Sequence, residues 1–275
     1  MRQKLGQHFL KNQEVLEKEV ADLDLKKGET VIEIGPGRGA LTKELLTHNL
    51  KQITKDLEIN IIAVEKDGEL VEALKETFRE DTNLEVIKGD VLKVLPEVTS
   101  KLESGSYKII GNIPYYLTGY LLRIIGELKN KPRLCVFIIQ KEVAERLVAQ
   151  PPRMNKLAAS VQFWANPEIL RLVSRKDFSP MPEVESALIR LKVLGDRLEV
   201  GEERYYRMVG ILFQQPRKTI LNNLTADKNA DFEKTRTITR MEMQKKLEEI
   251  GIRPDLRPQD LSVEDIVKIA RRFGT

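Results

Sequence analysis

Residues 30–42 read TVIEIGPGRGALT, and this stretch indicates the fold of the first part of the chain. An apolar run rich in β-branched residues passes into a loop that contains Gly35, Gly37 and Gly39, and a helical pattern follows. Glycines let the backbone turn sharply and approach a ligand closely, while Pro36 restricts the geometry around it. The stretch therefore predicts a strand, a ligand-binding loop at the strand's carboxyl end, and a helix.

The same alternation recurs along the first two thirds of the chain. Strand-like runs are separated by helical patterns such as LTKELL and ELVEALKETF, and the runs are TVIEI, NIIAVE, LEVIK, YKIIG and RLCVFIIQ. This order predicts a parallel sheet covered by helices. Two later runs, EILRLV and SALIRLKV, predict an antiparallel end to the sheet. The predicted fold class is α/β, with a Rossmann-like sheet.

The pattern changes near residues 194–201 and is helical from Glu202 onward, in segments such as RYYRMVGILFQ and SVEDIVKIARRF. We therefore predict a Rossmann-like domain over residues 1–195 and a small all-helical domain over residues 196–275.

The excess positive charge lies in the last third of the chain. Basic and acidic residues number 25 each up to Leu170, but 21 and 17 beyond it. A basic helical domain favours a phosphate-rich partner such as RNA, with Arg217 and Lys218 as candidate contacts. A solvated helix face is the alternative interpretation of these two residues.

Composition excludes several classes of protein. The 275 residues are 41% hydrophobic, with neither an eighteen-residue apolar run nor the apolar core of a signal peptide, so we expect a soluble cytoplasmic protein without a membrane partner. The single cysteine, Cys135, lies in an apolar run, and the two histidines, His8 and His48, are far apart in sequence. Neither a disulfide framework nor a metal site is expected.

Acidic residues end the second and third predicted strands. Glu65, in AVEKD, can accept hydrogen bonds from both ribose hydroxyls of an adenosine, and Asp90, in KGDVL, can accept one from the adenine amino group. A cap of a helix or turn is the commoner use of an isolated aspartate. Together with the glycine loop, these residues predict a site for S-adenosylmethionine, whose carboxylate would lie near the helix that begins at Ala40.

The fourth strand leads into GNIPYYLTG, residues 111–119. Asn112 Oδ1 and the Ile113 carbonyl can accept hydrogen bonds from the amino group of a base, which favours its pyramidal, nucleophilic form. Pro114 fixes the direction of that carbonyl, and Tyr115 can stack on the base. The competing interpretation is a proline turn with a half-buried tyrosine.

The ordered motifs resemble those of the ribosomal RNA adenine dimethyltransferases, particularly the kasugamycin-resistance type that acts on the small subunit. They are LGQHFL, EIGPGRGALT, AVEKD, KGDVL, GNIPYYLTG, QKEVAERL, FSPMPEVESALIRL and FQQPRKTILNNL. Two differences from the family's usual pattern are the loop AQPPRMNKLAASVQ and the sequence QPRK at residues 215–218, which has one basic residue fewer.

The resemblance implies a seven-stranded methyltransferase sheet followed by a helical RNA-binding domain. His8, Leu10, Gly35, Glu65, Asp90 and Asn112 would contact S-adenosylmethionine, and Phe178 would sandwich the flipped adenine against Tyr115. The implied reaction adds two methyl groups to each of two adjacent adenosines in the 3′-terminal hairpin loop of small-subunit rRNA. We expect a monomer that acts on a pre-ribosomal particle.

Three alternatives are weighed against this function. The related large-subunit enzymes of the macrolide-resistance type share most of these motifs, although FQQPRKTILNNL favours the small-subunit type. A ribosome-assembly or transcription factor could use the same fold to bind RNA, but Glu65 and Asn112 favour an enzyme. A small-molecule methyltransferase is disfavoured by the basic helical domain and by the pair of Phe178 and Tyr115.

Overall fold

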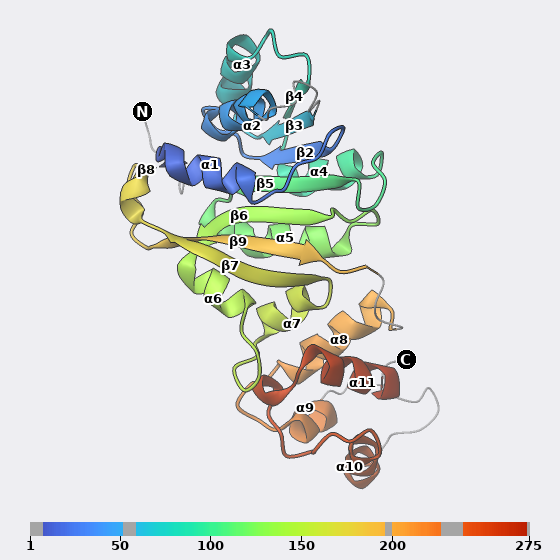
Figure 1. Cartoon of the computed structure of the whole chain (residues 1–275). Coiled ribbons are helices and arrows are strands. Elements are labelled where there is room, and N and C mark those ends of the chain that lie inside the picture. The colour runs from blue at the N-terminus through green and yellow to red at the C-terminus, as the bar shows by residue number, and fades with distance from the viewer. Residues whose placement is uncertain (1–7, 52–58, 196–199, 227–238, 274–275) are drawn as a thin grey trace. The chain divides into compact units, whose positions relative to one another are not determined.

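The structure is a computed structural model that describes residues 8–51, 59–195, 200–226 and 239–273 (Figure 1). The chain divides into two compact units, which are Met1–Glu145 with Ala165–Val193, and Arg146–Trp164 with Leu194–Thr275.

The first unit is built on a seven-stranded sheet with the order β4-β3-β2-β5-β6-β9-β7 (Figure 1). Its strands are β2 (Thr30–Ile34), β3 (Asn60–Glu65), β4 (Leu84–Lys88), β5 (Tyr107–Asn112), β6 (Leu134–Gln140), β7 (Ala165–Val173) and β9 (Ser186–Val193). The first five strands in this order pair in parallel, whereas β9 pairs antiparallel with both β6 and β7. The predicted α/β fold class is confirmed, and so is the antiparallel end of the sheet.

Helices cover both faces of this sheet. They are α1 (Gln13–Ala21), α2 (Ala40–Lys51), α3 (Gly68–Thr77), α4 (Val91–Thr99), α5 (Thr118–Glu127) and α6 (Lys141–Leu147), with short 3₁₀ turns η1 (Tyr115–Leu117) and η2 (Arg175–Asp177). α1 packs against α2, and α4 packs against α5. Figure 1 shows α1 in front of the sheet, with α4 and α5 behind it. A sheet covered in this way buries its central strands, and β5 and β6 are buried along most of their lengths.

The strand order reverses between β2 and β5, because the chain first adds β3 and β4 on one side of β2 and then returns to its other side. In open α/β sheets, ligands bind outside the carboxyl ends of the strands at such a switch point. The loops that follow β2, β3, β4 and β5 carry the predicted site residues.

A second, two-stranded sheet lies in the same unit and was not predicted. β1 (Phe9–Leu10) pairs antiparallel with β8 (Phe178–Ser179), which joins segments about 170 residues apart in sequence. Two-residue strands carry no detectable periodicity, so the pairing has no signature in the sequence.

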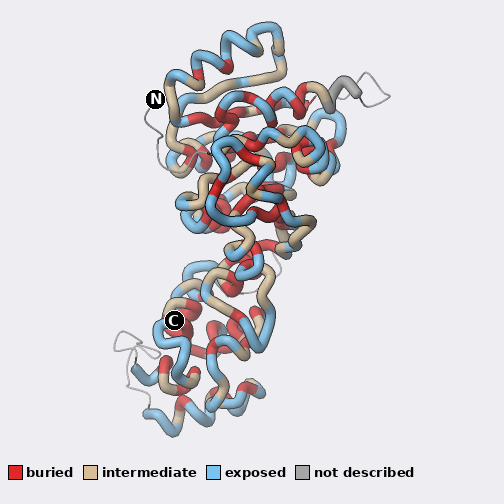
Figure 2. Tube along the Cα trace, turned by 90° about the vertical axis from the view of Figure 1, so that its left-hand side faces the viewer, coloured by how far each residue is buried: buried red, intermediate tan, exposed pale blue. Residues whose placement is uncertain are grey.

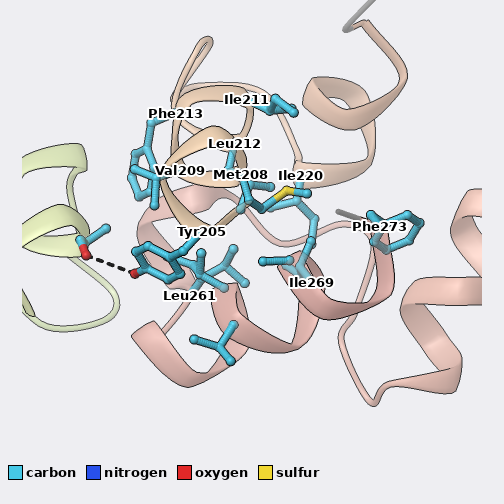
Figure 3. Packing of buried hydrophobic residues seen from close by; sticks show 14 of the residues in the cluster. Tyr205, Met208, Val209, Ile211, Leu212, Phe213, Ile220, Leu261, Ile269 and Phe273 are labelled. Atoms are coloured by element: carbon cyan, nitrogen blue, oxygen red, sulfur yellow. Dashed lines mark hydrogen bonds between the residues drawn. The ribbon is translucent and has the colours of Figure 1, made fainter. Parts of the chain in front are cut away.

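The second unit is helical. It contains α7 (Lys156–Gln162), α8 (Glu202–Leu212), α9 (Ile220–Ala226), α10 (Arg240–Glu249), α11 (Val263–Phe273) and the turn η3 (Pro258–Asp260). Figure 3 shows the buried side chains of α8, α9 and α11 that form its core, among them Met208, Leu212, Ile220 and Ile269. Tyr205 belongs to this core, and its hydroxyl donates to the Ala159 carbonyl at 2.9 Å.

The second unit also includes residues 146–164, which the sequence pattern placed in the first domain. Met154, Ala158 and Phe163 lie in the same hydrophobic cluster as the C-terminal helices, and the Phe163 ring stacks on Tyr205 with centroids 3.9 Å apart. The Gln162 side chain donates to the carbonyls of Leu147, at the end of α6, and Ala149, in the loop before α7. Shared burial, rather than sequence position, thus sets this boundary.

Figure 2 shows buried and exposed residues alternating closely along the helices, as expected for helices with one face on a core. Among the described residues, no helix combines the length and the apolar character needed to span a lipid bilayer.

Candidate active site

The glycine loop joins β2 to α2 as predicted. Gly35, Gly37 and Gly39 all have positive φ, at 65°, 59° and 82°. The Gly35 amide donates to the Val64 carbonyl at 3.0 Å, which holds the loop beside β3. A Cβ on Gly37 would lie 2.8 Å from the Phe9 ring, so this position requires glycine for space as well as for conformation.

The Glu65 carboxylate lies against this loop. Its Oε2 accepts from the Gly37 amide at 3.1 Å, and its Oε1 accepts from the amides of Lys66 and Asp67 at 2.8 and 2.9 Å. The Glu65 side chain is buried. Its backbone carbonyl accepts from the Gly89 amide, and this hydrogen bond joins the end of β3 to the end of β4. A carboxylate has about four acceptor positions, so Glu65 keeps room for a further donor.

Asp90 acts as the N-cap of α4, which is the commoner role considered for it. Its Oδ1 accepts from the Leu92 amide at 3.1 Å, and its Oδ2 accepts from Lys66 Nζ at 2.8 Å. The hydrogen bond from Lys66 holds the pKa of Asp90 below its usual range, so the carboxylate is charged at neutral pH. Its side chain remains 30% exposed beside the Glu65 loop.

Asn112 ends β5 at the switch point. Its Nδ2 donates to the His8 carbonyl at 3.0 Å, and no donor within the described parts of the chain reaches its Oδ1. The next residue, Ile113, is buried, and its amide donates to the Ile138 carbonyl at 3.0 Å. Pro114 follows with φ −52° as the N-cap of η1. The backbone on either side of the Ile113 carbonyl is therefore fixed.

The Tyr115 hydroxyl forms a hydrogen bond with a side chain of the core, which the sequence did not predict. Its hydroxyl is 2.9 Å from the hydroxyl of Ser186, a fully buried residue at the start of β9. Partial burial raises the pKa of Tyr115, so the phenol stays neutral. The His8 ring lies 5.9 Å from the Tyr115 ring, centroid to centroid.

A strap formed by His8, Phe9 and Leu10 joins these elements. His8 Nδ1 is 2.9 Å from the Pro180 carbonyl, and the Phe9 ring covers Gly37 with the Arg38 guanidinium 5.1 Å from the ring centroid. The strap therefore contacts both the glycine loop, through the Phe9 ring, and Asn112, through the His8 carbonyl. Phe9 was not predicted as a site residue, because only the pairing of β1 with β8 places it there.

The side chains of two residues expected at the ligand are buried in the hydrophobic core. Leu10 is 6% exposed and Phe178 is 2% exposed, and both belong to the cluster formed with α1, α2 and the central strands. Phe178 therefore exposes almost no ring surface in this structure, and its sandwich with an adenine against Tyr115 remains a prediction. The physical reason is the β1–β8 pairing, which turns both side chains toward the sheet.

Gly111 is a further residue that the sequence analysis missed. A Cβ at this position would lie 2.6 Å from the Ile34 carbonyl oxygen, where β5 approaches β2 at the switch point. The obstructing atom belongs to the backbone and cannot rotate away, so the two strands approach closely only with glycine here.

Gly111→Ala is expected to lower the free energy of unfolding by about 1–3 kcal/mol or more, since β2 and β5 must separate. Urea denaturation measures this loss. The matched control is Gly119→Ala in α5, where a Cβ meets nothing within 4 Å and a gain of up to about 1 kcal/mol is expected. Equal stability of both variants would contradict the close approach of the strands.

Two carboxyl groups are fully buried, that of Glu33 in β2 and that of Glu19 in α1. Glu33 Oε2 accepts from Thr42 Oγ1 at 2.7 Å, whereas Glu33 Oε1 and both oxygens of Glu19 have no hydrogen-bond partner among the described residues. Burial, opposed by the Thr42 hydrogen bond, raises the pKa of Glu33 to about 8, and burial also raises the pKa of Glu19, with the Glu33 charge as the next cause. The fold therefore favours neutral carboxyl groups here.

The raised pKa of Glu33 predicts a loss of stability with rising pH. Its stabilising effect is fully present below the unfolded value of 4.5 and is lost as the pH rises to about 8. At about 1.4 kcal/mol per unit, the loss is on the order of 3–5 kcal/mol. In urea denaturation between pH 5 and 8.5, Glu33→Gln should decline less than the parent, whereas Glu72→Gln, on the exposed side of α3, should follow the parent. Parallel curves for Glu33→Gln and the parent would show that Glu33 does not hold the proton.

In the helical unit, Arg217 and Lys218 lie exposed in the loop between α8 and α9. Asn223, which is buried, fixes this loop: its Oδ1 accepts from the Gln215 amide at 3.0 Å, and its Nδ2 donates to the carbonyls of Gln215 and Thr219. Asn223 belongs to the motif FQQPRKTILNNL, but the sequence pattern alone indicates no role for it.

A family model described as ribosomal RNA adenine dimethylase matches residues 1–257. Ribosomal RNA small subunit methyltransferase A of Dehalococcoides mccartyi strain CBDB1 is 37% identical to this chain, over 99% of this chain and 88% of the relative. The protein of the same name from Clostridium botulinum strain Loch Maree is 35% identical, over 97% of this chain and 91% of the relative.

Two solved structures share the fold over nearly all of both chains. A dimethyladenosine transferase from Plasmodium falciparum superposes with a TM-score of 0.78 at 23% identity, covering 95% of this chain and 96% of the other. The 23S rRNA methyltransferase ErmE superposes with a TM-score of 0.70 at 22% identity, covering 97% and 100%. These likenesses show the fold, while the family follows from the sequence matches. The resemblance noted in the motifs is confirmed, and the protein belongs to the ribosomal RNA adenine dimethylase family.

Proposed function

We propose that the protein uses S-adenosylmethionine to dimethylate the exocyclic amino groups of two adjacent adenosines in the 3′-terminal hairpin loop of small-subunit rRNA. The observation that carries this proposal is Asn112 at the switch point, where Nδ2 donates to the His8 carbonyl and Oδ1 accepts from no donor among the described residues. The family membership and relatives named for the small ribosomal subunit support it.

The residues at the strand ends fit the adenosine part of S-adenosylmethionine. Gly35 is exposed, and a Cβ there would meet nothing within 4 Å, so its outer side is open. Glu65 keeps one acceptor position for a ribose hydroxyl, and Asp90 is a charged, partly exposed acceptor for the adenine amino group. Asp90 Oδ2 also accepts from Lys66 Nζ, so the adenine amino group would share or replace this hydrogen bond. The Lys66 side chain is 72% exposed. When bound, the cofactor supplies a methyl group on a sulfonium, which is already a good leaving group.

The chain's own contribution is positioning and electrostatics. Asn112 Oδ1 and the Ile113 carbonyl accept hydrogen bonds from the two N–H groups of the target amine, which frees its lone pair for attack on the methyl group. Pro114 keeps the carbonyl in place, and the Tyr115 ring, tethered through Ser186, supplies one stacking face for the base. Holding the reactants in line supplies most of the rate gain that such a reaction needs, without a general base.

Glu65→Ala is expected to weaken S-adenosylmethionine binding by roughly 10-fold to 150-fold, because a charge-assisted ribose contact contributes about 1.5–3 kcal/mol. Isothermal titration calorimetry measures this affinity, and RNA binding should change little. Glu69→Ala, at an exposed position in the first turn of α3, serves as the control. Unchanged cofactor affinity in Glu65→Ala would refute the ribose assignment.

The proposed function is tested in cells that lack the protein, by mass spectrometry of both ribosomal RNAs. We expect loss of dimethyladenosine from the 3′-terminal hairpin of the small-subunit RNA, restored by the parent gene but not by Asn112→Ala. Loss from the large-subunit RNA alone would support the macrolide-resistance type. Normal methylation together with a defect in subunit assembly would support an RNA-binding assembly factor.

For its partners, we propose that the protein acts as a cytoplasmic monomer on a pre-ribosomal particle. In the helical unit, the loop held by Asn223 presents Arg217 and Lys218 to solvent, where they can neutralise RNA phosphates. Lys234 and Arg236, further candidates for such contacts, lie outside the described residues.

A further inference from the structure

One face of η1 and α5 carries exposed aromatic side chains. Tyr116 and Tyr120 are 65% and 66% exposed, although large aromatic residues normally bury most of their surface. They are four residues apart, so they occupy the same face one turn from each other. Arg123 continues this face, and Gly119 lies between the tyrosines, where an added Cβ would meet nothing within 4 Å. We name Tyr116, Gly119, Tyr120 and Arg123 the aromatic stripe.

The opposite face of α5 explains why the helix itself does not need these rings. Leu121, Leu122 and Ile125 are buried, with at most 2% of their surfaces exposed, and they attach α5 to the sheet. The two tyrosines contribute little to that packing, since about two thirds of each remains in contact with solvent. Their exposure requires another explanation than core formation.

The aromatic stripe begins at the candidate active site. Tyr116 directly follows Tyr115 in η1, and α5 continues from this turn. The stripe then follows α5 away from the site, toward Arg123.

Two exposed cations lie at the ends of this surface, each paired with a carboxylate: Lys66 with Asp90 and Arg123 with Glu127. Lys66 stands near one end with a 72% exposed side chain, and Arg123 stands at the other with a 76% exposed side chain. The first turn of α5 contains no acidic residue. Arg123 also contacts Glu127 Oε1 at 2.8 Å, an exposed i,i+4 pair that contributes little to stability and can open.

We propose that the aromatic stripe stacks the single-stranded nucleotides that flank the target adenosine. This inference rests on the proposed function. A base that leaves its stack to be methylated breaks the stacking of its neighbours, and exposed aromatic rings can restore it. Tyr116 and Tyr120 each offer a ring to one base, Gly119 leaves the space between them open, and Lys66 and Arg123 lie where phosphates would pass. Tyrosine and arginine are also common in protein interfaces; the direct continuation of the stripe from Tyr115 of the candidate active site favours nucleic acid.

The test compares Tyr116→Ala, Tyr120→Ala and the double alanine variant with the double phenylalanine variant, which keeps both rings. The control is Leu172→Ala on β7, another large residue that is 60% exposed. The substrate is small ribosomal subunits from cells that lack the protein. The binding probe is an RNA copy of the 3′-terminal hairpin with 2-aminopurine next to the target adenosines.

We expect each alanine substitution to raise the KM for subunits on the order of 10-fold, with kcat less affected. The 2-aminopurine quenching on binding should be lost in the double alanine variant and kept in the double phenylalanine variant. Cofactor affinity and thermal stability should match the parent, which excludes a folding defect.

Parent values of KM and quenching in the double alanine variant would overturn the proposal. Sedimentation gives a second outcome that would overturn the proposal. If the parent is a dimer and the double alanine variant is a monomer with unchanged quenching, the stripe is a contact between two copies of the protein. The proposed function fails separately: if the parent methylates no adenosine in these subunits while quenching still depends on both rings, the stacking surface stands and the assigned reaction does not.

Discussion

Asn112→Ala is expected to lower the single-turnover rate of methyl transfer on the order of 100-fold or more, because it removes the proposed hydrogen-bond acceptor for the target amine. RNA affinity should fall far less, since the proposed phosphate contacts lie elsewhere in the chain. The substitution also removes the hydrogen bond to the His8 carbonyl, so cofactor affinity is measured in parallel by calorimetry.

Two variants calibrate this result. Asn166→Ala, at an exposed position on β7, should react at the parent rate. Tyr115→Phe keeps the ring but loses the contact with Ser186, a cost of about 1 kcal/mol, and should remain active. Methyl transfer by Asn112→Ala at the parent rate would leave NIPY as a proline turn without a chemical role.

Phe178→Ala is expected to lower the free energy of unfolding by about 3–5 kcal/mol, because the ring is 2% exposed within the core of the sheet. Urea denaturation monitored by circular dichroism measures this change. A loss of that size is a large fraction of the stability of an ordinary domain.

Phe178→Leu separates the core role from a stacking role. Leucine fills most of the same volume but has no aromatic face, and a conservative swap in a core usually costs less than about 1.5 kcal/mol. We expect this variant to keep both its stability and its turnover. A stable Phe178→Leu protein whose turnover falls as in Tyr115→Ala would instead support the sandwich with the adenine.

The elements of the main sheet were predictable because they depend on local patterns. Short β-branched runs alternate with amphipathic helices, and this alternation leaves few topologies other than a doubly wound sheet. Residues directly after these strands were predictable in the same way. Gly37 and Glu65 lie at neighbouring strand ends, because the carboxyl ends of parallel strands share one edge of the sheet. The Gly37 amide nitrogen is 3.1 Å from Glu65 Oε2.

Contacts between distant segments were not predictable from such patterns. The Asn112 side chain bonds the His8 carbonyl across 104 residues of sequence, and the Tyr115 hydroxyl contacts Ser186 across 71. The burial of Phe178 depends on β1 and β8, two strands too short to carry a period.

The sequence by itself determined the fold class, the glycine loop and the order in which polar residues follow the strands, because each depends on neighbours along the chain. Only the tertiary structure decided that Phe178 belongs to the core, that Phe9 covers Gly37, and that residues 146–164 join the helical unit. These outcomes depend on which apolar surfaces meet, and the free energy of that burial depends on the assembled surfaces rather than on local sequence.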